Sequence, residues 1–544
     1  MNKNNKIKTL FLSVSFILIM LFAFNASIAS ERPLRCAAGM LAIIDPAAGR
    51  SMESIRAFCN LYDPLVFPDK DGKAQPHVAK SWDVSSDGRT WTVHIREGIK
   101  FHDGTELQAS DVKYSMDRLR RIGEGVSYLF LAQEIEIEVV DNYTVKFHLE
   151  RPEGVFIEKC VNFYIVNEDL VRENTEEEGP YGEMGDYGKG YLLEHDAGSG
   201  AYMVKEFVAE SYMDTVIYPD YWLPIDPNAP DAWKVIQASE PITIETLLRK
   251  REIEMSLSLQ SEETLKRFDQ IEGIDVTKYN MASHWNLPMH TRKPPTDDIH
   301  FRKAIAWAID YEGMIKYLFP GAKQIRGNVH PMVWGHDPTV FQYHRDLDKA
   351  REELKKSKYY DSLDQYPVEI YWITSDLIEE QIALAVMSYL GEIGITVDIK
   401  PMTWLGYSKD SSMIETTPNM FMFYESLRWP EALAQLDYRF MSSSAAGSSQ
   451  VEWLLDPVYD AMVDEVAATL DEEKRLEIYS KMQHYIVDLC PTIWICDNLT
   501  KTPYQSAYIE WYAAIEQPCP LTGYDLIMRN IKVYPEKREE LLKN

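Results

Sequence analysis

The sequence lacks the short motifs that mark several large classes of enzyme. It contains no G-x-x-x-x-G-K-[ST] loop to hold nucleotide phosphates, no H-E-x-x-H motif of a zinc protease and no G-x-S-x-G elbow of an α/β-hydrolase. Its 12 histidines are scattered singly, apart from His94 and His102. We therefore expect no catalytic centre and no cofactor of these classes.

Basic residues are also scarce. The 544 residues include 56 Lys and Arg against 85 Asp and Glu, which gives a formal net charge of −29. A surface of this sign repels phosphate backbones. The balance of charges excludes a nucleic-acid-binding role.

The chain has no apolar run after residue 24 that is long enough to cross a membrane. The run at 10–24 follows three lysines and precedes the small-residue stretch Ser27-Ile28-Ala29, an order that predicts a cleaved secretory signal peptide over residues 1–29. An uncleaved anchor is the alternative, and the short run disfavours it. Cys36, the nearest cysteine, follows Pro33-Leu34-Arg35, which is no lipidation site. We expect an unlipidated periplasmic protein.

Cysteines are few and are not grouped for metal binding. The sequence has no C-x-x-C pair and no Cys/His spacing of a zinc finger, so we expect no metal site. In an oxidising compartment, six cysteines can form up to three disulfides, and their pairing stays open. The six cysteines are at positions 36, 59, 160, 490, 496 and 519.

What the sequence does contain is typical of a folded globular protein, with 45% hydrophobic and 26% charged residues. A chain of this length is too long for one core, so we expect two or three domains. Residues 82–96 alternate apolar and polar side chains on both sides of Asp87-Gly88, which predicts a β-hairpin. Ser110 offers an N-cap for an amphipathic helix. The acidic stretch at 172–196 is expected to be a surface excursion.

The second half alternates strand and helix signals. One helix is expected from Asp297 to Pro320. A strand, a helix and a strand over 368–399 form a βαβ unit, which indicates a mixed or parallel sheet covered by helices. Residues 457–488 are expected to be helical, with a break near Asp471.

The order of the short motifs resembles a known family. The stretch P-H-V-A-K-S-W-D-V-S-S-D-G-R-T-W-T-V-H-I-R-E-G-I-K-F-H-D-G at 76–104 is followed by A-G-S-G-A-Y at 197–202 and P-P-T-D-D-I-H-F-R-K-A-I-A-W-A-I-D at 294–310. Together these motifs resemble the extracellular solute-binding proteins of bacterial ABC importers, in the large group (family 5) that includes peptide and nickel binders. The resemblance covers about residues 62–494.

This resemblance implies an α/β fold of the type II periplasmic-binding-protein kind, with two lobes and an extra N-terminal subdomain. Lobe I would comprise residues 30–288, including the extra subdomain at about 65–195. Lobe II would comprise residues 289–494, and residues 495–544 would return to lobe I. Ligands of such proteins are engulfed between the lobes by hinge closure.

An enclosed solute site is expected to be lined by aromatic faces with a few placed polar groups. Loops after strands, and positions that match the family's ligand-facing segments, supply the candidates for ligand binding. These are Tyr62, Trp285, Trp404, Tyr424, Glu425, Arg428, Trp429 and Trp494. The stretch from Tyr424 to Trp429 is favoured, because it gathers aromatic, acidic and basic side chains within six residues.

That stretch departs from the family's pattern. Dipeptide and oligopeptide binders carry an Asp before an Asp-Pro pair, which pairs with the peptide's α-amine. Here Ser426 lies near the amine-binding place and Trp429 precedes Pro430. Two hypotheses stay open: Glu425 pairs with a ligand ammonium, or Arg428 holds a ligand carboxylate in a bidentate pair.

The function implied is that of the substrate-binding component of an ABC importer. It would be a monomeric, non-catalytic protein that captures a small peptide or another charged organic solute and delivers it to an inner-membrane permease. Nickel is disfavoured because no clustered His or Cys presents a ligand set. The alternatives are a secreted hydrolase acting through cleft carboxylates, and a solute sensor or chaperone-like protein on the same scaffold.

Overall fold

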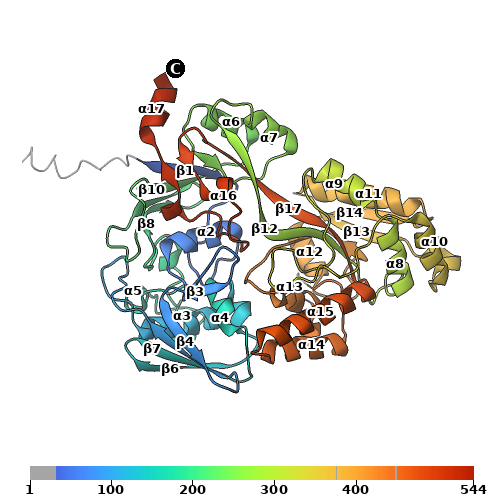
Figure 1. Ribbon diagram of the computed structural model, residues 1–544, viewed down its shortest axis with the longest axis horizontal. Helices are drawn as coiled ribbons and strands as arrows, with labels where there is room; N and C mark the ends of the chain where they lie inside the picture. The colour runs from blue at the N-terminus through green and yellow to red at the C-terminus, as the bar shows by residue number, and fades with distance from the viewer. Residues whose placement is uncertain (1–31, 375, 447–449, 544) are drawn as a thin grey trace, which may run out of the picture.

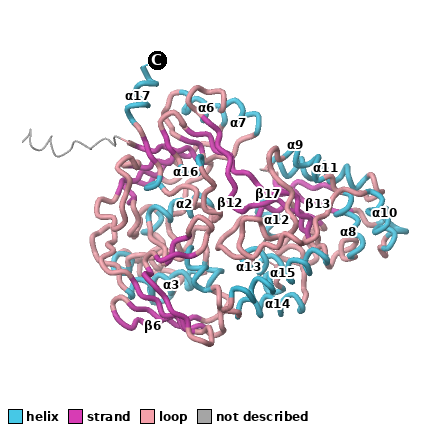
Figure 2. Tube along the Cα trace, viewed as in Figure 1, coloured by secondary structure: helices cyan, strands magenta, loops and turns pink. Residues whose placement is uncertain are grey.

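The computed structural model describes residues 32–374, 376–446 and 450–543, so the predicted signal peptide lies outside the described residues. Figures 1 and 2 show a mixed α/β protein with a large part, on the left, beside a smaller, helix-rich part on the right. The long strands β12 (Asp275–Pro288) and β17 (Thr492–Tyr504) run between them. Across the residues that the structure describes, no helix combines the length and the apolar character needed to cross a membrane.

An eight-stranded sheet forms the upper half of the large part, in the order β16-β12-β17-β11-β1-β10-β9-β8. Its shorter strands are β1 (Pro33–Ala38), β8 (Tyr202–Val208), β9 (Tyr212–Ile217), β10 (Ala232–Gln237), β11 (Met255–Ser256) and β16 (Phe423–Glu425). β1 pairs in parallel with β10 and β11, and the other neighbours are antiparallel. β12 and β17 pair from Asp275 opposite Tyr504 to Pro288 opposite Thr492, with irregularities between Asn280 and His284 and after Trp285. These two strands therefore extend the sheet into the right-hand part.

A four-stranded antiparallel sheet lies below, in the order β4-β5-β7-β6. Its strands are β4 (Ala79–Val84), β5 (Thr90–Ile95), β6 (Ile135–Asp141) and β7 (Thr144–Leu149), and a small hairpin, β2 (Val66–Pro68) with β3 (Ala74–Pro76), lies beside it. The predicted hairpin around Gly88 is thus confirmed. The helix α3 (Ala109–Ile122) begins two residues earlier than predicted, because Asp111 accepts a hydrogen bond from the backbone N–H of Gln108, which makes Gln108 the N-cap in place of Ser110.

The right-hand part is built on a parallel three-stranded sheet of β13 (Val368–Ile373), β14 (Val397–Met402) and β15 (Met420–Phe421). With α11 (Leu377–Gly391), β13 and β14 confirm the predicted βαβ unit. The single helix predicted from Asp297 to Pro320 is wrong. It is divided into α8 (Ile299–Ala308) and α9 (Tyr311–Leu318), because Ile309 is extended and Asp310 accepts from the N–H of Gly313 to cap the second helix.

The remaining helices cover these sheets. They are α2 (Met52–Leu61), α4 (Phe156–Lys159), α5 (Glu168–Glu173), α6 (Pro241–Arg249), α7 (Glu262–Phe268), α10 (Leu347–Lys356), α12 (Trp404–Asp410), α13 (Leu433–Phe440), α14 (Pro457–Ala468), α15 (Glu472–Leu489), α16 (Tyr512–Ile515) and α17 (Pro535–Lys543). The predicted break is confirmed at Asp471, which caps α15. Short 3-10 turns interrupt the acidic stretch at 172–196, which is largely exposed at its start.

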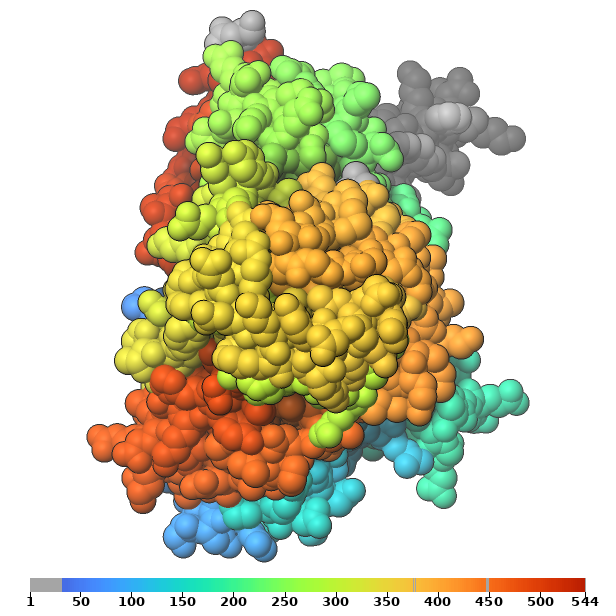
Figure 3. All heavy atoms as spheres, turned by 90° about the vertical axis from the view of Figure 1, so that its right-hand side faces the viewer, coloured from blue at the N-terminus to red at the C-terminus, as the bar shows by residue number. Residues whose placement is uncertain are grey.

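Apolar side chains are buried in two main cores. The smaller one lies between the three-stranded sheet and helices α8, α9 and α11. The larger one fills the N-terminal part and continues into α13, α14 and α15. The N–H of Gly154 donates to the carbonyl of Ala467 over 2.8 Å, and Lys73 pairs with Glu472 at 3.0 Å. Figure 3 shows the orange-red α14 and α15 region directly above the blue and cyan N-terminal residues. Helices α14 and α15 therefore pack against the N-terminal part.

The six cysteines are free thiols, so none of the disulfides that the sequence allows is formed. Five are buried and Cys519 is half-buried. The cysteines lie on separate parts of the fold, and two of the thiols make hydrogen bonds to nearby groups. The Cys59 thiol contacts the Tyr164 hydroxyl at 3.3 Å, and the Cys160 thiol donates to the carbonyl of Phe156 over 3.3 Å. Core packing holds these side chains without cross-links.

Candidate functional site

Strands β12 and β16 bring two of the predicted aromatic residues together where the chain passes between the two parts. Trp285 lies opposite Tyr424 in the ladder, with ring centroids 5.3 Å apart. The indole N–H of Trp285 donates to Oδ1 of Asn498 over 3.3 Å. Trp285 is buried, whereas Tyr424 is half-buried. Of the two aromatic side chains, only Tyr424 therefore has accessible surface that a solute could contact.

Glu425 follows Tyr424 and points into the protein. It is 1% exposed. Its carboxylate accepts from Nδ2 of Asn328 over 2.9 Å and from Nδ2 of Asn286 over 3.5 Å, while His284 Nε2 lies at 3.4 Å and Arg439 Nε at 3.5 Å. The protein itself therefore surrounds this carboxylate with donors. Its predicted role toward a ligand ammonium stays a prediction.

Several buried polar atoms around Glu425 have no hydrogen-bond partner among the described residues. They include both ring nitrogens of His284, Oδ1 of Asn286, Nε2 of His330 and Oε2 of Glu452. Burial lowers the pKa of His330 to about 3, so its ring is neutral at physiological pH. Each unpartnered group costs about 1–3 kcal/mol in an interior. This concentration of unmet hydrogen-bonding capacity marks the junction as the place where a polar molecule is best accommodated.

Tyr128, Arg428 and helix α13 define a region next to this junction, which we name the candidate recess. Tyr128 lies on the short turn η1 (Ser127–Phe130) and exposes 42% of its surface. Burial nevertheless raises the pKa of its hydroxyl, and the charged groups that influence it include Arg428, Asp437 and Arg50. Because the first two come from the C-terminal half of the chain, Tyr128 lies where the two halves of the chain approach each other.

Helix α13 contributes two side chains to the recess. Of its residues, Asp437 and Tyr438 are half-buried and the others are buried. Burial raises the pKa of Asp437 to about 6 and holds the pKa of the Tyr438 hydroxyl well above its usual value. The same helix therefore packs one face into the core and leaves the carboxylate of Asp437 and the phenol of Tyr438 partly exposed.

Arg428 and Asp437 are charged groups without an ion-pair partner. Within the described ranges, no opposite charge lies within 4.0 Å of either side chain. The guanidinium of Arg428 donates from one nitrogen to the backbone carbonyl of Arg50 over 3.1 Å, and Asp437 accepts from the adjacent N–H of Tyr438 over 2.5 Å. Desolvated charges are costly unless paired. A solute that carries both signs of charge would complement this arrangement.

Trp429, next to Arg428, is part of the contact between the two halves of the chain. Its ring is 2% exposed and lies under the ammonium of Lys159, which is 5.6 Å from the ring centroid. Lys159 also pairs with Glu153, and the side-chain amide of Asn162 donates to the carbonyl of Arg428. These contacts fix the backbone that carries Arg428.

The other predicted residues lie away from the recess or behind it. Tyr62 is 1% exposed and donates to the carbonyl of Ile44 over 3.0 Å, so it packs in the N-terminal core. Trp404 is 53% exposed on α12, beside Tyr407. Trp494 is 4% exposed and donates from its indole N–H to Oδ1 of Asn328 over 3.1 Å, behind Glu425. The structure thus gathers Trp285, Tyr424, Glu425, Arg428, Trp429 and Trp494 around the junction.

Sequence reasoning missed Tyr128, Asp437, Tyr438 and Arg50. No motif marks Tyr128, which lies on a short turn. In the sequence L-D-Y-R-F, Asp437 and Tyr438 look like ordinary polar positions of an amphipathic helix. A useful signal would have been the aromatic beside an acid, eight residues after the favoured stretch ends. It is too common in helices to stand out.

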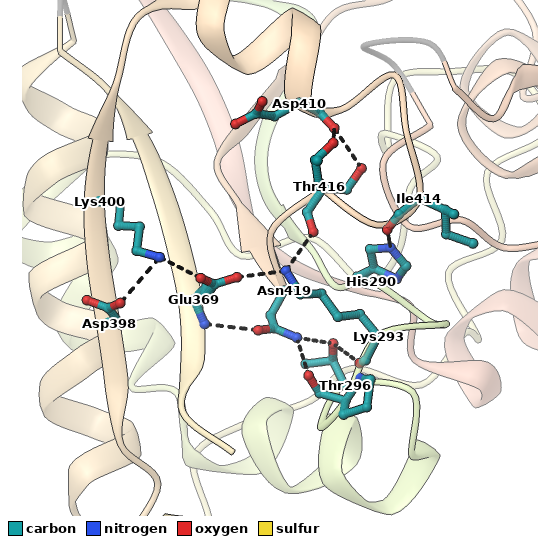
Figure 4. A network of polar contacts seen from close by, with 12 residues as sticks. His290, Lys293, Thr296, Glu369, Asp398, Lys400, Asp410, Ile414, Thr416 and Asn419 are labelled. Carbon is teal, nitrogen blue, oxygen red and sulfur yellow. Dashed lines mark hydrogen bonds and ion pairs between the residues drawn. The ribbon is translucent and has the colours of Figure 1, made fainter. Parts of the chain in front are cut away.

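A second polar network, half-buried in the right-hand part, is paired within the protein (Figure 4). The carboxylate of Glu369 accepts from Lys293 over 2.7 Å and from Lys400 over 2.5 Å, and its backbone N–H donates to Oδ1 of Asn419 over 3.0 Å. The amide of Asn419 donates in turn to the carbonyl of Pro294 over 2.9 Å. These charges are paired with one another within the protein. The network therefore connects β13 and β14, and its charged groups do not need a solute as a partner.

The arrangement nearest to a hydrolase triad has its parts in the wrong order. Asp63 accepts from the hydroxyl of Ser199 over 2.9 Å and contacts His77 Nε2 at 2.7 Å, and it also accepts from Tyr221 and Trp222. A triad needs the imidazole between the hydroxyl and the carboxylate. Here the carboxylate is central and buried, so the group is structural.

Neither small cavities nor metal ligands offer another site. Two hollows, one beside Arg118 and one beside Arg56, have a volume of about 10 Å³ each, which is room for one water molecule. Over the described ranges, no three His, Cys, Asp or Glu side chains come together to hold a metal ion.

Comparison with known proteins identifies the family of the chain. Residues 73–447 match the family model "Bacterial extracellular solute-binding proteins, family 5 Middle". The chain is 26% identical to the probable D,D-dipeptide-binding periplasmic protein DdpA of Escherichia coli K12, over 78% of this chain and 81% of that protein. It is 25% identical to the dipeptide-binding protein of the same organism, over 81% of this chain and 84% of the relative.

The fold is also found among solved structures. The periplasmic binding protein DppA from Helicobacter pylori, in complex with the peptide STSA, superimposes with a TM-score of 0.76 at 22% identity, covering 92% of this chain and 99% of its own. This is the type II periplasmic-binding-protein fold that the sequence predicts. The chain belongs to the bacterial extracellular solute-binding proteins of family 5.

Proposed function

We propose that this protein is the substrate-binding component of an ABC importer, and that it captures a small peptide or another charged organic solute in the recess bounded by Tyr128, Arg428 and α13. The observation that carries the proposal is the pair of opposite charges without an ion-pair partner among the described residues, Arg428 and the partly buried Asp437, close to the aromatic side chains Tyr128, Tyr424 and Tyr438. Aromatic walls with a few placed polar groups are the usual composition of an organic-solute site.

The names of the relatives support a peptide as the solute, because two of them are named as dipeptide-binding. A role in binding without bond-making is supported by the membership of a binding-protein family and by the central carboxylate of the Asp63 group. The bound solute would leave the recess unaltered and pass to an inner-membrane permease.

Location and assembly are part of the proposal. The protein would be exported by its signal peptide, over residues 1–29, and would act as an unlipidated periplasmic monomer. The mass of the exported protein tests cleavage and lipidation together: a chain that begins at Ser30 without added mass is expected, and a retained leader or an added acyl mass would contradict this.

Two lobes, 30–288 and 289–494, with 495–544 returning to the first, would move about the crossings near Met289 and Trp494. The two long strands that end or begin beside these residues support such a hinge, since two adjacent crossings permit rotation with few broken contacts.

Native mass spectrometry with an equimolar library of di- and tripeptides tests the function. The expected result is retention of particular peptides at one per protein, with their masses unchanged on release. Retention of no peptide would overturn peptide binding, and a peptide released in cleaved form would overturn the non-catalytic role.

A further inference from the structure

Both ring nitrogens of His102 face hydrogen-bond acceptors. Nδ1 lies 2.5 Å from Oδ1 of Asp196, and Nε2 lies 3.0 Å from the backbone carbonyl oxygen of Gly200. An ionised carboxylate and a carbonyl have no proton to donate. A neutral imidazole carries one N–H and one bare nitrogen, so it satisfies only one of these two contacts. The geometry therefore calls for a ring with protons on both nitrogens, which is the imidazolium.

A proton on Asp196 would be the alternative, and the contacts of this carboxyl group disfavour it. Oδ1 also accepts from the backbone N–H of Gly198 over 3.1 Å, and Oδ2 accepts from the N–H of Val204 over 2.7 Å. Both oxygens are thus in use as acceptors, and hydrogen bonds of this kind favour the ionised form. The proton between the two side chains therefore belongs on the ring of His102.

His290 shows the contacts of a buried histidine that is neutral. Its Nδ1 accepts from the backbone N–H of Arg292 over 3.0 Å, and its Nε2 contacts the carbonyl oxygen of Ile414 at 3.0 Å. One bare nitrogen and one N–H satisfy both contacts, and burial lowers the pKa of His290 to about 4. His102 differs because its Nδ1 meets a carboxylate where His290 meets an N–H.

The pair of His102 and Asp196 is enclosed, and it has no other cation. The two side chains are 8% and 5% exposed. Among the residues that the structure describes, no Lys or Arg lies within 4.0 Å of Asp196. Burial by itself lowers the pKa of His102, but Asp196 and the carbonyl of Gly200 outweigh burial and raise the pKa above the usual 6.5. The other ionisable groups around the pair are Asp63, Asp103, Tyr62, Tyr191 and Tyr218.

The pair joins segments that lead into different sheets. His102 lies in the turn between β5 of the four-stranded sheet and α3, whereas Asp196 and Gly200 precede β8 of the eight-stranded sheet. The backbone N–H of His102 also donates to the carbonyl of Gly198 over 2.9 Å. The same segment lies against the end of α2, where the N–H of Gly200 donates to the carbonyl of Leu61 over 3.0 Å. Loss of the ring's charge would leave Asp196 enclosed without a cation at this joint.

We propose that His102 is an imidazolium in the folded protein at neutral pH, and that it acts as a pH-sensitive clamp between residues 101–104 and 196–204. Because the pKa of His102 in the folded protein lies above the unfolded value of 6.5, the stabilisation is fully present below about pH 6.5 and is lost as the pH rises through the folded pKa. The clamp uses none of the residues that bound the recess, so it does not depend on which solute is bound.

Nuclear magnetic resonance of the mature chain, labelled with 15N at histidine, tests the charge. The signals of His102 are identified by their loss in His102→Gln. At about pH 6 we expect N–H protons on both ring nitrogens of His102 and a titration midpoint above 6.5, whereas His290 should show a single ring N–H. A single ring N–H on His102, or a midpoint at or below 6.5, would overturn the charge and the clamp with it.

Hydrogen exchange of the wild-type backbone amides, measured by mass spectrometry, tests the clamp. After correction for the intrinsic exchange rate, the protection of residues 98–106 and 196–204 should fall as the pH rises past the measured midpoint. The expected loss is about tenfold for each pH unit by which that midpoint exceeds 6.5, because one unit of pKa corresponds to a tenfold change in an equilibrium. Protection of these two segments that stays constant with pH would overturn the clamp even if the ring is charged.

His102→Gln keeps a polar side chain that cannot carry the charge. Its loss of protection relative to the wild type should be greater at about pH 6 than above the midpoint, by the same factor that the wild type loses on titration. His94→Gln, at a histidine of β5 that is 36% exposed, is the matched control and should leave both segments unchanged at each pH. A His102→Gln effect of equal size at every pH would assign the contact to packing and overturn the clamp. The two wild-type measurements stand without any variant.

Discussion

Asn328 donates a hydrogen bond from its side-chain amide to Oε1 of Glu425 over 2.9 Å. The oxygen of the same amide accepts from the indole N–H of Trp494 over 3.1 Å. One buried side chain thus ties β16 to β17 at the place where the chain passes between the two parts. Two residues that the sequence suggests as ligand contacts are therefore held by the protein, behind the recess.

Asn328→Ala is expected to destabilise the protein by about 2–3 kcal/mol, because it removes the shortest hydrogen bond to the buried Glu425 carboxylate and leaves the Trp494 indole N–H without a partner. Urea unfolding followed by tryptophan fluorescence measures the loss. Asn530→Ala, at an exposed asparagine, should change the free energy of unfolding by less than about 0.5 kcal/mol. Equal effects of the two substitutions would contradict the bridging role.

Lys159→Met should cost about 3–5 kcal/mol of stability, because it leaves Glu153 buried without its cation. The comparison is Lys80→Met, which removes an exposed ion pair with Glu97 at 3.9 Å and should cost less than about 1 kcal/mol. Unfolding by urea at neutral pH gives both values. A small effect of Lys159→Met would mean that Glu153 finds another partner or a proton.

Asp437 should destabilise the ligand-free protein at neutral pH. Burial raises its pKa to about 6 from the ordinary 3.8, with Lys159 opposing and Glu153 adding to the shift. Well below pH 3.8 the carboxyl is protonated in both folded and unfolded chains and contributes nothing. As the pH rises toward 6, the unfolded chain ionises first, so the free energy of unfolding falls.

Asp437→Asn should therefore stabilise the ligand-free protein by about 1–3 kcal/mol at pH 7.5 and by almost nothing at pH 3.5. Urea titrations at the two pH values measure the difference. A gain of the same size at both pH values would assign the effect to packing, and a loss at pH 7.5 would show that the carboxylate is already well paired.

The thiols give a chemical test of the core. Burial raises the pKa of Cys59 and Cys519 to about 12, and Cys496 is buried with a raised pKa as well. Thiolates are the reactive form. Alkylation of the native, unreduced protein should be slow, whereas alkylation in denaturant should label all six cysteines. Fewer labels in denaturant would reveal a disulfide.

Most helices, strands and turns could be predicted from the sequence, because turn residues and hydrophobic periodicity are local signals. The hairpin at Asp87-Gly88, the βαβ unit and the cap at Asp471 follow from residues next to one another in the chain. The errors were local as well. Gln108 is the N-cap of α3 in place of Ser110, because Asp111 accepts a hydrogen bond from its backbone N–H. Asp310 is the N-cap of a second helix, α9, although the apolar pattern continues across the break between α8 and α9.

The candidate site could be predicted only in part, because its residues come from segments that are far apart in the sequence. Tyr424 and Arg428 were found because they follow a strand in a stretch that matches the family. Asp437 influences the Tyr128 hydroxyl although more than half of the chain's length separates the two residues, and no sequence period indicates that they are close. The sequence also does not distinguish Glu425, which is buried, from Asp437, which is half-buried. The two acidic residues differ in burial, and burial depends on the tertiary fold.

The most direct test of the account is a crystal structure of the protein grown with the peptide that it retains. The account predicts one intact peptide in the recess bounded by Tyr128, Arg428 and α13. A peptide bound on another surface, or a recess filled by side chains while the protein is saturated with peptide, would contradict it.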